Sequence, residues 1–185
     1  MTELVASELY TVDDLDAMPD DGRRRELIDG MLFVSPAPGW AHQEMGLALY
    51  RSLHSVCPRE LRVLAAPFSV RTSRHDDVEP DVLVARYDDL TPANLPVAPL
   101  LAVEVASRST RLHDRNTKRA HYERLGVPSY WLLDPSEPGR IEVLELDDGA
   151  YRLVAEATGE ERLTIDRPFT VTVCPADLLA GLRPG

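Results

Sequence analysis

The sequence contains almost no lysine. Lys118 is its single lysine, and the other nineteen of its 20 basic residues are arginines. Both side chains carry a positive charge, but a lysine can lose its proton when its surroundings lower its pKa, whereas an arginine cannot. Because this chain otherwise meets its need for positive charge with arginine, the one lysine invites a chemical explanation.

Cysteines and long apolar runs are also scarce. The two cysteines, Cys57 and Cys174, have no further Cys or His close enough to build a zinc site, and unpaired thiols are typical of a reducing compartment. No run approaches the roughly eighteen apolar residues of a membrane-spanning helix, and the first residues are acidic where a secretory signal is basic. We therefore expect a cytoplasmic protein without a membrane partner.

Positive charge is in the minority. The formal net charge is -11 at pH 7, and neutralisation of phosphates by basic residues supplies most nonspecific nucleic-acid binding. The charge therefore excludes a protein that coats nucleic acid along its whole surface. Any contact with nucleic acid must be local.

Patterns of apolar and turn-forming residues divide the chain into three parts. Residues 1–22 indicate a lead-in helix with Thr11 as its N-cap. Residues 23–135 carry hairpin, strand and helix patterns and form the expected core, and residues 136–185 add C-terminal strands. Since no linker or low-complexity tract separates these parts, we expect one domain over residues 1–185.

The order of the elements predicts the fold class. Asp-Gly pairs between apolar runs are typical of two-residue hairpin turns, and continuous apolar runs are typical of buried strands. We expect a hairpin around 29–30, a helix at 41–56, strands at 60–71, 81–87 and 100–107, a helix at 112–125, a strand at 129–135 and a hairpin around 148–149. This order predicts an α/β (α+β) fold, in which a mixed central sheet is flanked by helices and followed by an extra C-terminal hairpin.

Two carboxylates lie in or beside apolar strands. Glu104 interrupts the apolar run 100–106, where burial of an ionised group without a partner is costly, and Asp81 opens the preceding strand after Pro80. Two acids on adjacent strands suit a hard cation such as Mg²⁺, which takes one or two carboxylates and keeps several waters. The alternatives are an ion pair between Glu104 and an arginine, and a turn role for Asp81.

Lys118 lies on the expected helix at 112–125. It shares one helical face with Asp114, Tyr122 and Leu125, at spacings of four and three residues, so we expect its side chain to face the sheet. The alternative is a surface lysine paired with Asp114.

Four arginines form a second stripe along or just before the same helix: Arg108, Arg111, Arg115 and Arg119. Such a stripe can reach the phosphates of a nucleic-acid backbone, or can simply be a solvated basic face.

Glu26 and His42 are further candidates for the site. Glu26 lies on the first expected strand and could approach the cleft or pair at the surface with the arginines at 23–25. His42 begins the long helix and could line the site, or could be structural or exposed.

The spaced motifs of this chain resemble those of the Uma2 family, which is grouped with the restriction endonucleases of the PD-(D/E)xK nuclease superfamily. The motifs are ELIDG at 26–30, His42, EPDV at 79–82, EVAS-x-ST at 104–110, D-x-x-x-K at 114–118, Y-x-x-x-GV at 122–127 and YW-x-x-DP at 130–135. Together they are far more specific than any one alone. The resemblance covers about Glu26 to Pro135 and is weaker beyond residue 140.

The resemblance implies a metal site and names its acids. Asp81 corresponds to the acid of the PD motif and Glu104 to the second acid, the carbonyl of Val105 is a further metal ligand, and Glu26 is an auxiliary acid. The cofactor implied is Mg²⁺ or Mn²⁺.

The resemblance also implies that the lysine has moved. The motif has lysine at the position of Ala106, so the standard arrangement is broken here. The lysine of the D-x-x-x-K motif, Lys118, takes its place from the following helix and would orient or deprotonate the attacking water.

The implied activity is metal-dependent hydrolysis of phosphodiester bonds in nucleic acid, with DNA as the expected substrate. His42, Arg108, Arg111, Arg115 and Arg119 are the candidate substrate contacts, and a homodimer is expected because a two-strand cut by a compact nuclease usually needs two active sites. Two alternatives stay open: an inactive nuclease fold that binds DNA or regulates, and a partner-binding structural domain in which Glu104 and Lys118 form a buried salt bridge.

Overall fold

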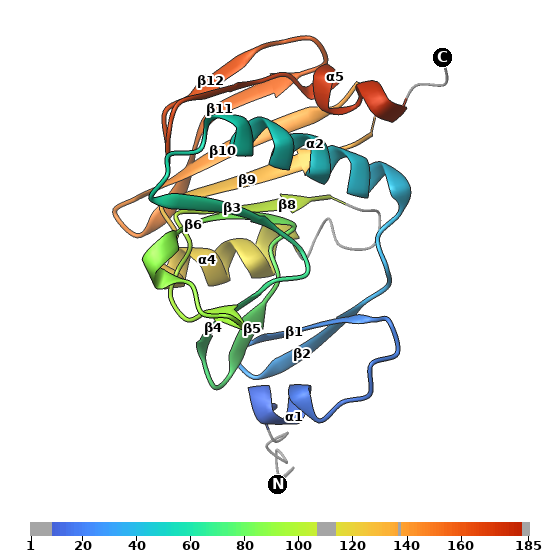
Figure 1. Ribbon diagram of the computed structural model, residues 1–185, viewed down its shortest axis with the longest axis vertical. Coiled ribbons are helices and arrows are strands. Elements are labelled where there is room, and N and C mark those ends of the chain that lie inside the picture. Colours follow the sequence, from blue (N-terminus) through green and yellow to red (C-terminus); the bar gives the residue numbers. More distant parts are fainter. Residues whose placement is uncertain (1–8, 107–113, 137, 183–185) are drawn as a thin grey trace, which may run out of the picture.

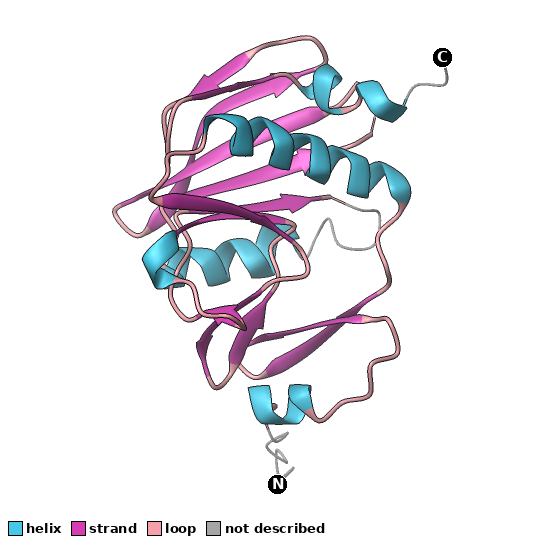
Figure 2. Ribbon diagram, in the orientation of Figure 1, coloured by secondary structure: helices cyan, strands magenta, loops and turns pink. Residues whose placement is uncertain are grey.

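The computed structural model describes residues 9–106, 114–136 and 138–182. These residues form two larger β-sheets with helices packed against them, and a small two-stranded sheet near the C-terminus. Figure 1 shows the elements in chain order and Figure 2 shows the division into helices and strands.

The larger sheet has six strands in the order β11-β10-β9-β8-β6-β3. Only β8 and β9 run parallel, and the other neighbours are antiparallel. Its strands are β3 (Leu61–Ala65), β6 (Val82–Arg86), β8 (Leu101–Val105), β9 (Ser129–Asp134), β10 (Arg140–Asp147) and β11 (Ala150–Thr158). A parallel pair needs a crossover connection, and here that connection includes η2 (Asp114–Lys118) and α4 (Arg119–Leu125).

The smaller sheet has five strands in the order β2-β1-β5-β4-β7. They are β1 (Arg24–Ile28), β2 (Met31–Ser35), β4 (Ser69–Ser73), β5 (Asp76–Val78) and β7 (Asn94–Leu95). Asp29 and Gly30 connect β1 to β2 with φ angles of 53° and 74°, the left-handed conformations that a two-residue hairpin turn requires. Helix α1 (Val12–Asp16) lies below this sheet in Figure 1 and is capped by Thr11 through a capping box.

Each face of the six-stranded sheet has its own helix. Helix α2 (Trp40–Val56) buries Met45, Leu49 and Leu53 against one face, together with side chains such as Val103. On the other face, Tyr122 of α4 packs with Leu83, Ala85, Ala102 and Tyr130. Figure 1 shows the two helices separated by strands β8 and β9.

The remaining elements close the chain. Strand β12 (Leu163–Ile165) pairs with β13 (Val171–Val173), followed by α5 (Pro175–Leu178) and η3 (Ala180–Leu182), while η1 (Tyr87–Asp89) follows β6. Among the residues with described structure, no helix is both long enough and apolar enough to cross a membrane.

The expected fold class is confirmed, and two details differ from expectation. The single strand expected at 60–71 is two strands, β3 and β4. Strand β3 ends before Ala66-Pro67, and the chain then enters the second sheet as β4. The helix expected at 112–125 contains a π-helical turn, η2, before α4, and it ends at Gly126 in the left-handed conformation that its C-cap position favours.

His121 of α4 connects this helix to the smaller sheet. Its ring is buried, its Nδ1 lies 3.5 Å from Oδ1 of Asp76 in β5, and its Nε2 is buried without a hydrogen-bond partner among the described residues. Burial lowers the pKa of His121 below its ordinary value although Asp76 opposes this shift. The folded protein therefore holds this imidazole in its neutral form near neutral pH.

We expect His121 to make the fold less stable at acid pH. Because its pKa is lower in the folded than in the unfolded chain, the unfolded chain takes up the proton first, so stability falls as pH drops below about 6.5. Urea unfolding of the wild type and of His121→Gln between pH 5 and 7.5 should give a flatter pH dependence for the variant. Parallel curves for the two proteins would show that His121 is not the responsible group.

Candidate active site

Asp81 is anchored at the start of β6 by contacts from three other segments. Its Oδ2 accepts a hydrogen bond of 2.8 Å from the backbone N–H of Val105 and lies 3.1 Å from Nε2 of His42, while its Oδ1 accepts a bond of 2.8 Å from Nη1 of Arg24. Burial acts to raise the pKa of Asp81, but the hydrogen bond from His42 and the charges of Arg24, His42 and Lys118 lower it well below its ordinary value. Asp81 is therefore an ionised carboxylate at neutral pH.

Glu104 lies on the same face of the sheet as Asp81. Val82 pairs with Val103 in the antiparallel register of β6 and β8, so the next step in this register sets Asp81 opposite Glu104. Alternation along β8 turns Val103 toward α2 and Glu104 toward α4, and on that side Oε1 of Glu104 accepts a hydrogen bond of 2.9 Å from the hydroxyl of Tyr122. The register thus sets the two predicted acids opposite each other on neighbouring segments of the sheet.

Lys118 joins Glu104 to Glu26. Its Nζ lies 2.9 Å from Oε1 of both carboxylates, and the lysine, Glu104 and Glu26 are all at most 3% exposed. Glu26 comes from β1 of the smaller sheet and also accepts a hydrogen bond of 2.8 Å from the backbone N–H of Glu79. Burial acts to raise the pKa of Glu26, but the charges of Lys118 and Arg24 lower it below its ordinary value. Lys118 is therefore a buried cation between two carboxylates and not a surface lysine.

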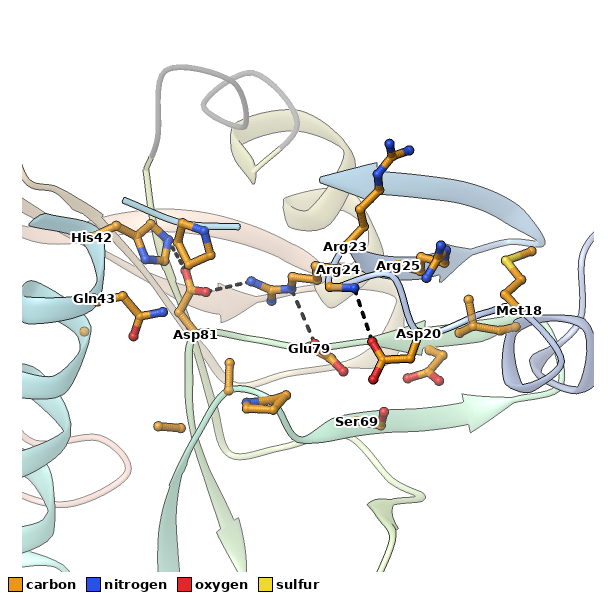
Figure 3. Close-up of a pocket in the computed structure, with 18 of the residues that line it drawn as sticks. Met18, Asp20, Arg23, Arg24, Arg25, His42, Gln43, Ser69, Glu79 and Asp81 are labelled. Carbon is orange, nitrogen blue, oxygen red and sulfur yellow. Dashed lines mark hydrogen bonds and ion pairs between the residues drawn. The ribbon is translucent and has the colours of Figure 1, made fainter. Parts of the chain in front are cut away.

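Arg24 is a site residue that sequence reasoning missed. Its guanidinium lies within 2.8 Å of Asp81, 3.4 Å of Glu26 and 3.6 Å of Glu79, and its side chain is 18% exposed. Figure 3 shows it between Asp81 and Glu79. The signal was the period of a strand, because Arg24 lies two residues before Glu26 and so points to the same side of β1.

A pocket of about 520 Å³ opens beside these residues. Asp81, His42, Arg24 and Glu79 contribute to its lining, and Figure 3 shows their side chains together. Leu15 of α1, Leu47 of α2 and Met18, which follows α1, supply apolar parts of the wall. The pocket therefore gives a ligand access to Asp81, whereas Glu26, Glu104 and Lys118 do not line it and are almost fully buried.

The four arginines predicted to contact substrate have no described contact with the acids of the site. Arg119 donates a hydrogen bond of 2.8 Å to the carbonyl of Tyr151 and lies 3.5 Å from Glu123, so it is tied to the C-terminal hairpin. Arg108 and Arg111 lie outside the described residues, and so does the side chain of Arg115. Glu79 lies beside Arg24, and Tyr122 donates a hydrogen bond to Glu104. In the sequence Glu79 is only part of the EPDV motif, and Tyr122 is only part of a helical face and of the Y-x-x-x-GV motif.

The carboxylate oxygens of this site are the type of ligand that a hard divalent cation prefers. Asp81 and Glu104 offer carboxylate oxygens from neighbouring strands, and Mg²⁺ commonly takes one or two carboxylates and fills its remaining positions with water. In the described parts of the chain no group of three or more His, Cys, Asp and Glu residues is arranged to hold a metal. The residues therefore fit an ion bound by two acids and water, and each of these acids is at present paired with an internal cation.

Comparison with known proteins gives a family for the chain and a neighbour for its fold. A model of the Uma2 family, described as "Putative restriction endonuclease", matches residues 12–176. The fold is similar to a crystal structure from Anabaena variabilis described as a "putative nuclease belonging to DUF820", with a TM-score of 0.74 and 18% sequence identity, covering 94% of this chain and 99% of that one. A search of curated proteins gave no match. The family model spans most of the chain and includes Glu26, Asp81, Glu104 and Lys118, so the protein belongs to the Uma2 family.

Proposed function

We propose that this protein is a metal-dependent endonuclease that hydrolyses phosphodiester bonds in DNA. The observation that carries the proposal is that the single lysine of the chain lies 2.9 Å from Glu104, in a strand whose register sets Glu104 opposite Asp81. Membership of a family described as "Putative restriction endonuclease" supports the same class of reaction.

The metal would be held by Asp81, Glu104 and the carbonyl of Val105. When bound, Mg²⁺ or Mn²⁺ supplies an activated water and neutralises charge that develops on the phosphate. His42 and the N–H of Val105 orient the Asp81 carboxylate, and Tyr122 orients that of Glu104. These contacts fix the two acids before substrate arrives.

Lys118 is the proposed proton-transfer group. Glu26 and Glu104 hold its ammonium from two sides, so its position depends on both carboxylates. A lysine placed in this way can orient the attacking water or exchange a proton with it. Glu26 is then an auxiliary acid, because it positions the lysine and has no direct part in holding the metal.

The substrate would reach Asp81 through the pocket lined by Arg24 and His42. The proposed contacts to backbone phosphates are Arg108, Arg111 and Arg115. In a chain of net charge -11, contact with nucleic acid depends on such a local group of basic side chains. A homodimer would supply two such sites for a cut through both strands.

One observation favours a second candidate, an inactive nuclease fold that binds nucleic acid. Each carboxylate of the cleft is already paired with Arg24, His42 or Lys118, which is what a purely structural network of buried ion pairs would look like. Binding of metal and DNA without cleavage would favour this candidate.

The experiment that tests the proposal is cleavage by the purified protein. Single-stranded and duplex DNA and RNA should be incubated with Mn²⁺ or with EDTA, using Glu104→Gln as the site variant and Glu123→Gln, a carboxylate of α4 that binds the N–H of Tyr151, as the matched control. We expect metal-dependent cleavage of DNA by the wild type and by Glu123→Gln, with little or none by Glu104→Gln. Equal activity of the Glu104 variant would exclude this site.

Replacement of Lys118 by arginine separates charge from proton transfer. Arginine retains the cation but cannot exchange a proton, so cleavage should fall by about a hundredfold to ten-thousandfold while metal binding persists. Arg124→Lys, the reverse change on α4 where the guanidinium pairs with Asp29, should leave the rate close to that of the wild type. Circular dichroism of each protein verifies the fold. A Lys118→Arg protein with near-normal cleavage would mean that the lysine acts only through its charge.

A further inference from the structure

Arg24 and a metal ion would compete for the same oxygen. Oδ2 of Asp81 already receives the N–H of Val105 and faces His42, whereas Oδ1 receives only Arg24 among the described residues. A divalent cation that binds Asp81 must therefore approach Oδ1. Two cations cannot share that oxygen at contact distance without strong repulsion, because they lie in a site of low exposure where charges are weakly screened.

The contacts of Arg24 allow it to leave. Its Nη1 makes the one short bond, to Asp81, while the contacts to Glu26 and Glu79 are 3.4 and 3.6 Å long. Its Nε is buried without a hydrogen-bond partner within the described chain. The guanidinium also lines the pocket of about 520 Å³, so there is space beside it for the side chain to move.

We propose that Arg24 is a built-in substitute for the metal: it neutralises Asp81 while no ion is bound, leaves Oδ1 when a divalent cation arrives, and then binds a phosphate of the nucleic acid in the pocket. The proposal rests on the proposed metal-dependent nuclease function. Its chemistry is that of guanidinium, which pairs equally well with a carboxylate and with a phosphate.

The exchange keeps Asp81 paired with a cation throughout. Asp81, Glu26 and Glu79 surround Arg24, and a divalent ion at Asp81 brings two positive charges where the departing guanidinium removes one, so these acids stay compensated. The same exchange links the two ligands, since an ion at Asp81 makes Arg24 available to phosphate. Metal and nucleic acid should therefore strengthen each other's binding.

The test measures binding and needs no cleavage. Mn²⁺ binding is followed by calorimetry in the wild type, in Arg24→Gln and in Arg25→Gln, whose parent side chain turns instead to Asp21 and the carbonyl of Pro19. We expect Arg24→Gln to bind Mn²⁺ more tightly by roughly 5- to 150-fold, the usual range of coupling between sites, while Arg25→Gln binds as the wild type does. Asp81→Asn added to Arg24→Gln should abolish the gain.

A second arm measures DNA binding, and its wild-type part does not depend on the folding of a variant. Affinity for a short DNA duplex is measured with Ca²⁺ or with EDTA, and should rise with Ca²⁺ in the wild type by more than in Arg24→Gln. Equal Mn²⁺ affinity in the wild type and in Arg24→Gln, or an equal gain in DNA affinity, would overturn the role of Arg24. Absence of Mn²⁺ binding in every protein would overturn it together with the proposed metal dependence.

Discussion

The ammonium of Lys118 between Glu26 and Glu104 is the interaction on which the site depends. From η2, at the N-terminus of α4, it joins the central strand β8 and the first strand of the smaller sheet. Three charges that are almost fully buried are stable only when they are close together and hydrogen-bonded, and removal of one partner from such a group is strongly destabilising. The two sheets and α4 are therefore held in the relative positions that the site requires.

This arrangement explains why the single lysine matters in a chain rich in arginine. A compact ammonium fits between two carboxylate oxygens at 2.9 Å, whereas the planar fork of a guanidinium demands a wider and differently oriented set of acceptors. Arg24 shows the contrast, since its guanidinium spreads over Asp81, Glu26 and Glu79 at the wall of the pocket. The two cations share Glu26, while Asp81 and Glu79 lie beside Arg24 and Glu104 lies beside Lys118.

Local patterns in the sequence were enough to predict most elements and the inward direction of Lys118. The Asp29-Gly30 turn, the helix ending at Val56 and the left-handed Gly126 each follow from nearby residues. The second sheet could not be predicted in this way, because the pairs that assemble it, β1 with β5 and β4 with β7, join residues far apart in the sequence and no local pattern names these partners.

The inward turn of Arg24 escaped prediction for a similar reason. In the run Arg23 to Arg25 the period of a strand places Arg24 on one side and its two neighbours on the other, but the sequence alone does not say which side is buried. Only the packing of β1 against the cleft, through Glu26, decides it.

The account makes Asp81 and Glu104 the ligands of one ion. Until that ion binds, Arg24 and Lys118 pair with these two carboxylates instead. The most direct measurement is a crystal structure of the wild-type protein grown with Mn²⁺, in which anomalous scattering locates the metal. The account predicts a manganese peak bonded to carboxylate oxygens of both Asp81 and Glu104, with Arg24 withdrawn from Oδ1 of Asp81. A Mn²⁺ ion bound elsewhere, with Arg24 and Lys118 still paired to these acids at saturating metal, would contradict it.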